Sequence, residues 1–434
     1  MKMKLIIVTA VGCAMSVLSS SRTAEAQPPP HREQSPDAAI ALTLTEAVAR
    51  TLAHNPDLKI AAQDIRIAEA DVRQARVIPN PEIEWEGEDI SGSMGGLGSS
   101  AHTIVLSQTI ELGGKRSSRT RQAESHVTVA EADFEAAHLD VLAELAARFT
   151  RALVAQQRVE LRIAGIRLAE ELRDAAREKV AVGATATVEA IRADVALSNA
   201  RIDSARGWSE ATNARRQLAA MWGGTEPDFD SVTGDLPTCA PPPDVSVLLR
   251  AGDETPRVRH WSAAMQRAQN NLAAERASAV PDITISAGPR FFAENGNRTF
   301  VFGLSLPIPL FNRNQGAVVG ARRKIEQAEW QYDAARTQWR SDLLTTHEEM
   351  TAAYNEATTI AEQVIPQAEA AFIEIQRGYR QGRFGYLDLL AAEQDLIAAR
   401  ERLLDAHGDY LMRRIAIECL IGQTIDDIGE HDDR

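Results

Sequence analysis

The chain has 434 residues, a formal net charge of −14 and an apolar content of 44%. So acidic a chain argues against a nucleic-acid-binding protein, because it would repel phosphates rather than neutralise them. Cys239 and Cys419 are the only cysteines after the N-terminal segment, and they can form at most one bridge, which excludes a disulfide scaffold. No run of 18 apolar residues follows that segment, so the sequence predicts no transmembrane helix.

Residues 1–26 have the organisation of a secretory signal peptide. Lys2 and Lys4 precede an apolar stretch, and Ala24-Glu25-Ala26 forms a small-x-small cleavage site before a short linker over residues 27–41. A short N-terminal anchor is one alternative. Lipidation of Cys13 in place of cleavage after Ala26 is another, and the sequence leaves both open.

The rest of the chain is a duplication. Pairs of matching landmarks recur at an offset of 198 to 200 residues, including Asn55-Pro56 with Thr255-Pro256 and Met221-Trp222-Gly223 with Leu420-Ile421-Gly422. A period this long indicates a repeated domain-sized unit rather than a solenoid. We therefore expect a first repeat over residues 42–223, a Pro-rich linker over 224–254, a second repeat over 255–422 and an acidic tail over 423–434.

Each repeat is predicted to open with a helix, at about residues 45–77 and 256–279, that stops at a proline. Two strands follow in each, at about residues 81–88 and 102–112 and at 282–288 and 299–306, because polar and apolar residues alternate there. Such alternation is typical of membrane-barrel strands and also of half-buried soluble sheets. In the barrel interpretation the lumen-facing residues are Glu82, Glu84, Glu86, Asp282, Thr284 and Ser286, and the lipid-facing residues are Ile83, Trp85, Ile283, Ile285, Phe300 and Phe302.

Long helices are predicted after each strand pair, at about residues 117–182 and 315–381, with return helices at about 187–221 and 386–420. Apolar residues in them alternate at steps of three and four, the period of a left-handed coiled coil. One such seam includes Leu145, Phe149 and Ala152, and another includes Leu389, Leu396 and Ala406. A soluble coiled-coil rod explains these helices equally well, but it does not explain the paired strands.

Four strands are too few for a membrane barrel, which needs at least about eight. Amphipathic strands facing lipid would also leave open edges that a bilayer does not tolerate. The sequence therefore predicts a barrel closed by several copies of the chain, arranged with rotational symmetry.

Three motifs carry a family resemblance: Ile78-Pro79-Asn80-Pro81-Glu82, the segment 107–116 that ends in Gly-Gly-Lys-Arg, and the segment 307–316 that contains Phe-Asn-Arg-Asn. On these motifs the chain resembles the TolC-like outer-membrane factors of tripartite efflux pumps over about residues 42–423. Within that family it is most similar to the CzcC-type branch of heavy-metal cation efflux.

The resemblance implies a mainly α fold in which a homotrimer forms a 12-stranded membrane β-barrel continued by a long α-helical coiled-coil barrel in the periplasm. It implies a location in the outer membrane of a Gram-negative bacterium and contact with outer-membrane lipid. The implied partners are a periplasmic adaptor (a membrane fusion protein) and an inner-membrane, proton-driven exporter of the resistance-nodulation-division type. The duct would passively conduct heavy-metal cations of the cobalt, zinc and cadmium class, with no catalytic, cofactor or metal-binding residue expected.

The same resemblance assigns the turns at the periplasmic ends of the helical pairs to adaptor contact or gating. The residues concerned are Gly183, Glu189, Tyr379, Gly382 and Asp388. The two carboxylates have a second interpretation, as residues that stabilise the first turn of the return helices. Phe384 and Ala391 depart from the polar pattern of the multidrug-type tip, which puts a gate of that kind in doubt.

Two alternative functions remain open at this point. The same fold could serve multidrug export or type I protein secretion. A more remote alternative is a periplasmic coiled-coil adaptor, although an adaptor has one helical hairpin where this sequence predicts two. The residues do not identify the exported ion, the gate or the partner proteins.

Overall fold

The computed structural model of the chain describes residues 40–88, 100–252 and 255–427. The predicted signal peptide, Cys13, most of the N-terminal linker, most of the first inter-strand loop and the end of the acidic tail lie outside these residues. The chain divides into two compact units. We call residues 60–136 and 256–337 the strand unit, and residues 40–59, 137–255 and 338–427 the helical unit, so each unit contains parts of both repeats.

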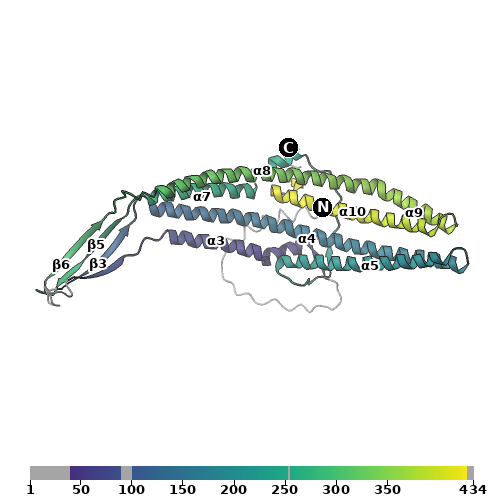
Figure 1. The fold of residues 1–434 in the computed structure, drawn as a ribbon, viewed down its shortest axis with the longest axis horizontal. Helices are drawn as coiled ribbons and strands as arrows, with labels where there is room; N and C mark the ends of the chain where they lie inside the picture. The colour runs from purple at the N-terminus through teal and green to yellow at the C-terminus, as the bar shows by residue number, and fades with distance from the viewer. Residues whose placement is uncertain (1–39, 89–99, 253–254, 428–434) are drawn as a thin grey trace. The chain divides into compact units, whose positions relative to one another are not determined.

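The strand unit contains one four-stranded antiparallel sheet with the order β2-β3-β5-β6. Its strands are β2 (Glu82–Glu88), β3 (Ala101–Ile110), β5 (Ile283–Phe292) and β6 (Arg298–Ser305). In Figure 1, β3, β5 and β6 lie side by side. The central β3–β5 pairing joins the strand pair of the first repeat to that of the second. Consequently β2 and β6, one from each repeat, are the two edges.

The strands lie within a few residues of their predicted positions because alternation is a strong local signal. The strand unit also contains α7 (Pro256–Ser278), most of α3 (Pro56–Ala75), and the first parts of α4 (Lys115–Ala181) and α8 (Gln315–Thr359). Each of these helices runs into or out of the sheet through a short junction.

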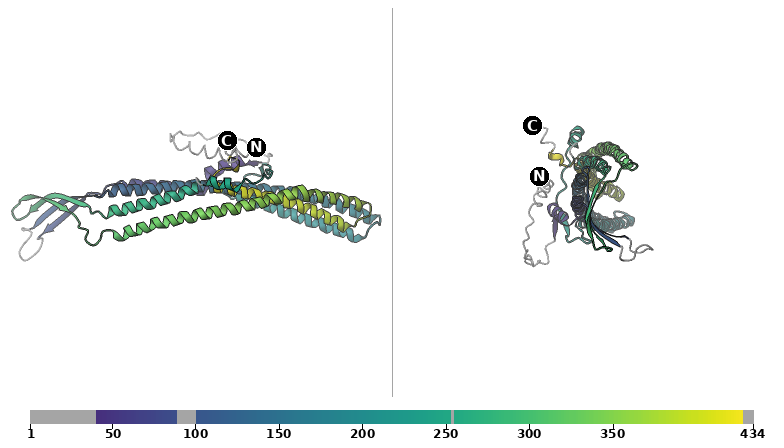
Figure 2. Two further views of the ribbon diagram at one scale, coloured as in Figure 1. Left: turned by 90° about the horizontal axis from the view of Figure 1, so that it is seen from above. Right: turned by 90° about the vertical axis from the view of Figure 1, so that its left-hand side faces the viewer.

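The helical unit contains the two helical hairpins. Its hairpin helices are the rest of α4, α5 (Thr187–Ala219), α9 (Ile365–Arg380) and α10 (Tyr386–Ile421). Figures 1 and 2 both show α9 and α10 side by side in yellow-green and yellow. The predicted coiled-coil seams are buried in these helices, with Leu145 and Leu389 each 0% exposed.

Several short elements complete the helical unit. Parallel strands β1 (Ala41–Thr43) and β4 (Ser231–Thr233) pair with each other. The helices α2 (Leu44–His54) and α6 (Val245–Ala251) and the 3-10 turn η2 (Ala220–Trp222) pack around them and the long helices. The sequence did not predict β1, β4 or α6, because three to seven residues are too few to show a period.

The helix predicted over residues 45–77 is two helices, so the prediction of one continuous helix was wrong. Asn55 has an extended ψ of 128° between α2 and α3, as expected for a residue that precedes a proline. Its amide nitrogen donates to the Met221 carbonyl at 2.9 Å, and its amide oxygen accepts from the Leu58 N–H at 3.0 Å. The side chain therefore caps α3 and ties it to the 3-10 turn η2 (Ala220–Trp222) that follows α5.

The helix predicted over residues 315–381 is also interrupted, by a π-helical turn, η4 (Ile360–Val364). The Ile365 N–H donates to the Ile360 carbonyl across this wider turn. Pro366 follows directly, and a proline inside a helix has no N–H and clashes with the carbonyl four residues earlier. The π turn accommodates Pro366 without ending the helix.

Across the described part of the chain, none of the helices combines the length and the apolar character needed to cross a membrane.

Close packing marks the junction between β3 and α4. Gly113 has a φ of +68°, and a Cβ there would lie 2.6 Å from the Cβ of Val280. Beside it, the Lys115 ammonium lies 2.7 Å from the Asp282 carboxylate, which also accepts a hydrogen bond from the Leu112 N–H at 3.0 Å. Only glycine satisfies both the left-handed conformation and the contact with Val280.

We predict that Gly113→Ala lowers the thermal midpoint of the purified protein more than Gly296→Ala. Gly296 has nearly the same φ, +67°, but a Cβ there would meet no atom within 4 Å. Gly296→Ala, the control, should lower the free energy of unfolding by about 1 to 2 kcal/mol because of the left-handed backbone alone. Gly113→Ala should cost about 1 to 3 kcal/mol more because of overpacking. Equal losses in circular-dichroism melts would contradict the argument from Val280.

Candidate functional site

One face of the four-stranded sheet is apolar and open. The register places Ile83 opposite Leu106, Leu106 opposite Ala287, and Ala287 opposite Phe302. Ile83 is 77% exposed and Phe302 is 79% exposed. All six predicted lipid-facing residues share this face by their register: Ile83, Trp85, Ile283, Ile285, Phe300 and Phe302. The chain alone thus leaves a broad apolar surface uncovered, which marks an interaction surface.

The opposite face of the sheet is polar. Ser107 lies opposite both Glu82 and Ser286, and the hydroxyls of Thr109 and Thr284 hydrogen bond at 3.1 Å. Five of the six predicted lumen-facing residues share this face: Glu82, Glu84, Glu86, Thr284 and Ser286. The sixth, Asp282, precedes β5 and is held by Lys115 and the Leu112 N–H.

The two hairpin turns of the helical unit have the same backbone geometry. Gly183 and Gly382 have φ values of +72° and +75°. The Ala184 N–H donates to the Lys179 carbonyl at 2.8 Å, and the Arg383 N–H donates to the Gly378 carbonyl at 2.8 Å. This is the pattern of a helix that ends in a left-handed glycine. Both repeats therefore use one turn, although their side chains differ.

Tyr379 is the centre of the side-chain contacts at these turns. It is buried, and its ring meets that of Tyr386 edge-on with centroids 6.2 Å apart. The Lys179 ammonium lies 3.9 Å from the centroid of the Tyr379 ring and donates to its carbonyl, while the Tyr379 hydroxyl lies 3.5 Å from the Glu189 carboxylate. Burial, and secondarily the Glu189 charge, raises the pKa of Tyr379 to about 12. Tyr379 thus remains a neutral phenol that connects the two hairpins.

The five predicted tip residues divide into three groups. Glu189 and Tyr379 are brought together, whereas Asp388 is exposed and accepts a hydrogen bond from the Gly385 N–H at 3.0 Å. Asp388 therefore makes the contact expected of a carboxylate in the first turn of a helix. Gly183 and Gly382 supply the turns themselves. An acidic ring of Glu189 and Asp388 stays a prediction.

Phe384, the departure noted in the sequence, packs onto the second turn. A Cβ at Gly378 would lie 2.2 Å from the Phe384 ring, so the ring covers the backbone of a glycine. At this position the multidrug-type tip has a polar side chain, whereas here the apolar ring of Phe384 contacts bare backbone.

Sequence reasoning missed Glu393 and Lys179. Glu393 is only 4% exposed and lies on the buried face of α10 with Leu389, Ala392 and Leu396. Burial raises the pKa of its carboxyl to about 7. An acidic residue in register with an apolar seam was a signal that could have identified it, whereas nothing local pairs Lys179 with Tyr379. In the described residues, no group of three or more His, Cys, Asp or Glu side chains is placed to hold a metal ion.

We predict that Glu393 makes the folded protein less stable as the pH rises. Its pKa is about 7 when folded against an ordinary value of 4.5, so the unfolded chain loses this proton first. Stability should fall between about pH 4.5 and pH 7 by an amount on the order of 3 kcal/mol and then level off. Glu393→Gln should abolish this component, as measured by thermal midpoints from pH 4.5 to 8.

The matched control is Glu178→Gln, because Glu178 is an exposed residue of α4. The thermal midpoint of Glu178→Gln should depend on pH as the wild-type midpoint does. A Glu393→Gln protein whose midpoint follows the same pH curve as wild type would show that the carboxyl ionises freely.

Comparison with known proteins places the chain in a family. The family model for outer membrane efflux protein matches residues 47–224 and 248–423. The chain is 32% identical over 387 residues to the cobalt-zinc-cadmium resistance protein CzcC of Cupriavidus metallidurans, covering 89% of this chain and 91% of that protein. It is 27% identical over 330 residues to the nickel-cobalt-cadmium resistance protein NccC of Alcaligenes xylosoxydans xylosoxydans, covering 75% and 71%.

The fold also matches solved structures. The outer membrane protein VceC of Vibrio cholerae superposes with a TM-score of 0.71 at 19% identity, covering 88% of this chain and 96% of that one. This likeness confirms the predicted TolC-like fold. The matched family model and the 32% identity to CzcC establish that the chain belongs to the outer membrane efflux protein family.

Proposed function

We propose that three copies of this chain assemble into an outer-membrane duct that passively conducts heavy-metal cations from the periplasm to the exterior. The observation that carries the proposal is the sheet of the strand unit. Within the part of the chain that the structure describes, it has four strands, two unpaired edges at β2 and β6, and one exposed apolar face.

Closing this sheet requires further copies. In lipid every backbone N–H and C=O must be paired within the protein, so an open edge is excluded and the barrel has to be complete. Pairing β6 of one copy with β2 of the next satisfies both edges. Three copies then supply twelve strands, which is within the range of bacterial barrels.

The two faces of the sheet supply the two sides of such a barrel. The face that carries Ile83, Trp85, Ile283, Ile285, Phe300 and Phe302 would meet lipid. The face that carries Glu82, Glu84, Glu86, Thr284 and Ser286 would line the lumen, with Asp282 at its end. Carboxylates along the lumen favour the passage of cations.

The relatives support the choice of cargo. CzcC is described by its name as a cobalt-zinc-cadmium resistance protein, and NccC as a nickel-cobalt-cadmium resistance protein. The duct itself would consume no energy. An inner-membrane proton-driven exporter would supply it, and a periplasmic adaptor would join the exporter to the turns at Gly183 and Gly382.

We predict that deletion of the gene sensitises the cell to cobalt, zinc, cadmium or nickel salts in growth assays. Metal would accumulate because the last step of export is blocked. A panel of organic antibiotics and dyes tested in parallel separates the alternatives, since sensitivity to organic compounds alone would overturn the metal cargo. Restored growth on plasmid-borne wild type is the control for polar effects of the deletion.

We further predict that Phe302→Arg strongly reduces the amount of heat-modifiable oligomer in the outer membrane. A charge on the lipid face of a barrel costs about 2 to 4 kcal/mol near the bilayer midplane. The matched control is Thr299→Arg, because Thr299 is an exposed residue of the same strand on the polar face. Thr299→Arg should assemble normally. If Thr299→Arg loses the oligomer while Phe302→Arg assembles, the assignment of the lipid-facing and lumen-facing sides of the sheet would be reversed.

A further inference from the structure

A pocket at the start of helix α4 is lined mainly by arginine side chains. Its volume is about 540 Å³, which is in the range of small-molecule sites. We call it the arginine pocket, and its lining consists of Arg76, which follows α3, and Arg116, Ser117, Thr120 and Arg121 on the first turns of α4. Guanidinium groups offer several N–H donors and a fixed positive charge, so the lining suits a phosphate group.

The positive charge of the arginine pocket is only partly balanced by carboxylates. The Arg76 guanidinium pairs with the Glu124 carboxylate at 2.9 Å. Arg116 and Arg121 are exposed, and within the described residues neither of them forms an ion pair. Arg121 donates to the Ser118 hydroxyl at 3.3 Å, a neutral group that leaves its charge uncompensated. The pocket therefore keeps positive charge for an anionic ligand.

The opposite side of the same helix start belongs to the polar face of the sheet. The Lys115 ammonium lies 2.7 Å from the Asp282 carboxylate, and the Arg119 guanidinium pairs with the Glu111 carboxylate. Glu111 and Asp282 continue the alternation of the polar face just beyond the ends of β3 and β5. Lys115 and Arg119 therefore mark the side of α4 that follows the predicted lumen.

The arginine pocket opens on the other side of α4. Ser117 comes two residues after Lys115, and Arg121 comes two residues after Arg119. Two residues correspond to about 200° of rotation around an α-helix. The pocket thus lies on the side that continues the exposed apolar face of the sheet, which is the predicted lipid-facing side.

The apolar face of the sheet ends where the arginine pocket begins. Ile104, Leu106 and Ile110 are exposed on this face of β3. From Ile104 to Ile110 the strand rises about 20 Å, which covers most of the roughly 25 Å apolar band of an outer-membrane barrel. Arg116 follows six residues after Ile110, and Figure 1 shows α4 starting beyond the end of β3. Lipid headgroups lie directly outside the apolar band, so the pocket is at the level of their phosphates.

From this geometry we infer that the arginine pocket binds the phosphate of an anionic phospholipid in the periplasmic leaflet of the outer membrane. The inference rests on the proposed duct, because only a sheet inserted in the membrane brings the pocket next to lipid. Arg116 and Arg121 bind the phosphate oxygens, and the acyl chains extend along Leu106 and Ile110. Basic pockets at a membrane surface bind anionic headgroups in this way. The bound lipid holds the start of α4 at the membrane surface.

Lipid binding by the assembled protein tests the inference. The full-length oligomer is purified from outer membranes in detergent and titrated with phosphatidylglycerol or with phosphatidylcholine, and native mass spectrometry measures the lipid bound. Wild type should prefer phosphatidylglycerol, a comparison that needs no variant. Arg116→Gln combined with Arg121→Gln should weaken phosphatidylglycerol binding by about tenfold or more, because two cationic contacts are lost.

The matched control combines Arg167→Gln with Arg192→Gln, which removes two exposed arginines of the helical unit. This control has the same change of net charge and should bind phosphatidylglycerol as wild type does. Excess inorganic phosphate should leave the bound lipid in place. Displacement of the lipid by inorganic phosphate would show a site for soluble anions and overturn the phospholipid as the ligand.

The heat-modifiable oligomer, measured on gels of the same membranes, reports the duct independently of the lipid. An assembled wild type that binds both lipids equally would overturn the inference and leave the duct intact. The same holds if the Arg116→Gln, Arg121→Gln protein binds phosphatidylglycerol as tightly as the control. A wild-type chain that forms no oligomer in the outer membrane would overturn the duct and the lipid site with it.

Discussion

The sheet of the strand unit cannot be completed by the chain that contains it. Its order, β2-β3-β5-β6, uses the strand pair of each repeat, and among the described residues β2 and β6 remain its two unpaired edges. Its apolar face is exposed by three quarters or more at Ile83 and Phe302. Exposed apolar area is costly in water, and unpaired backbone groups are prohibitive in lipid. In the proposed duct, each repeat supplies only a part of a barrel that several copies share.

The duplication of the repeat fits the proposed sharing of one barrel between several copies. The two turns of the helical unit share a left-handed glycine and the same pair of hydrogen bonds, so the backbone of one repeat is reproduced in the other. The side chains then differ. Lys179 and Glu189 come from the first repeat, and both contact Tyr379 from the second. Joining unlike residues in this way makes the pair of hairpins a specific unit rather than two interchangeable ones.

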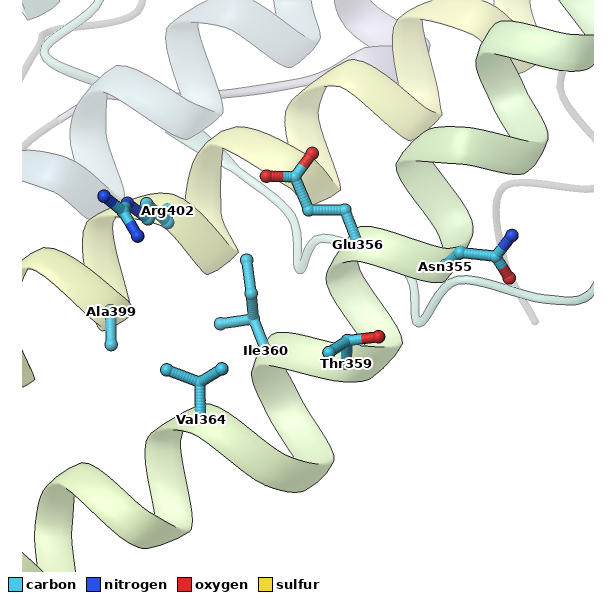
Figure 3. A pocket seen from close by; sticks show the side chains of 7 residues that line it. All are labelled: Asn355, Glu356, Thr359, Ile360, Val364, Ala399 and Arg402. Atoms are coloured by element: carbon cyan, nitrogen blue, oxygen red, sulfur yellow. The ribbon is translucent and has the colours of Figure 1, made fainter.

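Proline and glycine placement explains where the helices bend, end or change their turn. Pro56 divides α2 from α3, Pro366 coincides with the π turn, and Gly113 allows β3 to pass into α4 against Val280. Each of these residues acts through its own backbone, which is why its effect is local. The notch at η4, which Ile360, Val364 and Ala399 line (Figure 3), is a consequence of the second of them.

The sequence by itself determined the repeat, the strand pairs, the coiled-coil seams and the two polar and apolar faces, because each is encoded by a short period along one segment. The alternation of polar and apolar residues at Glu82, Ile83 and Glu84 can be recognised from this segment alone. What the sequence could not decide depends on residues far apart in the chain. The pairing of β1 with β4, the contact of Tyr379 with Lys179 and Glu189, and the burial of Glu393 exist only when the helices are packed together. Local periods carry no information on which side chains meet across the fold, so only the tertiary structure established these contacts.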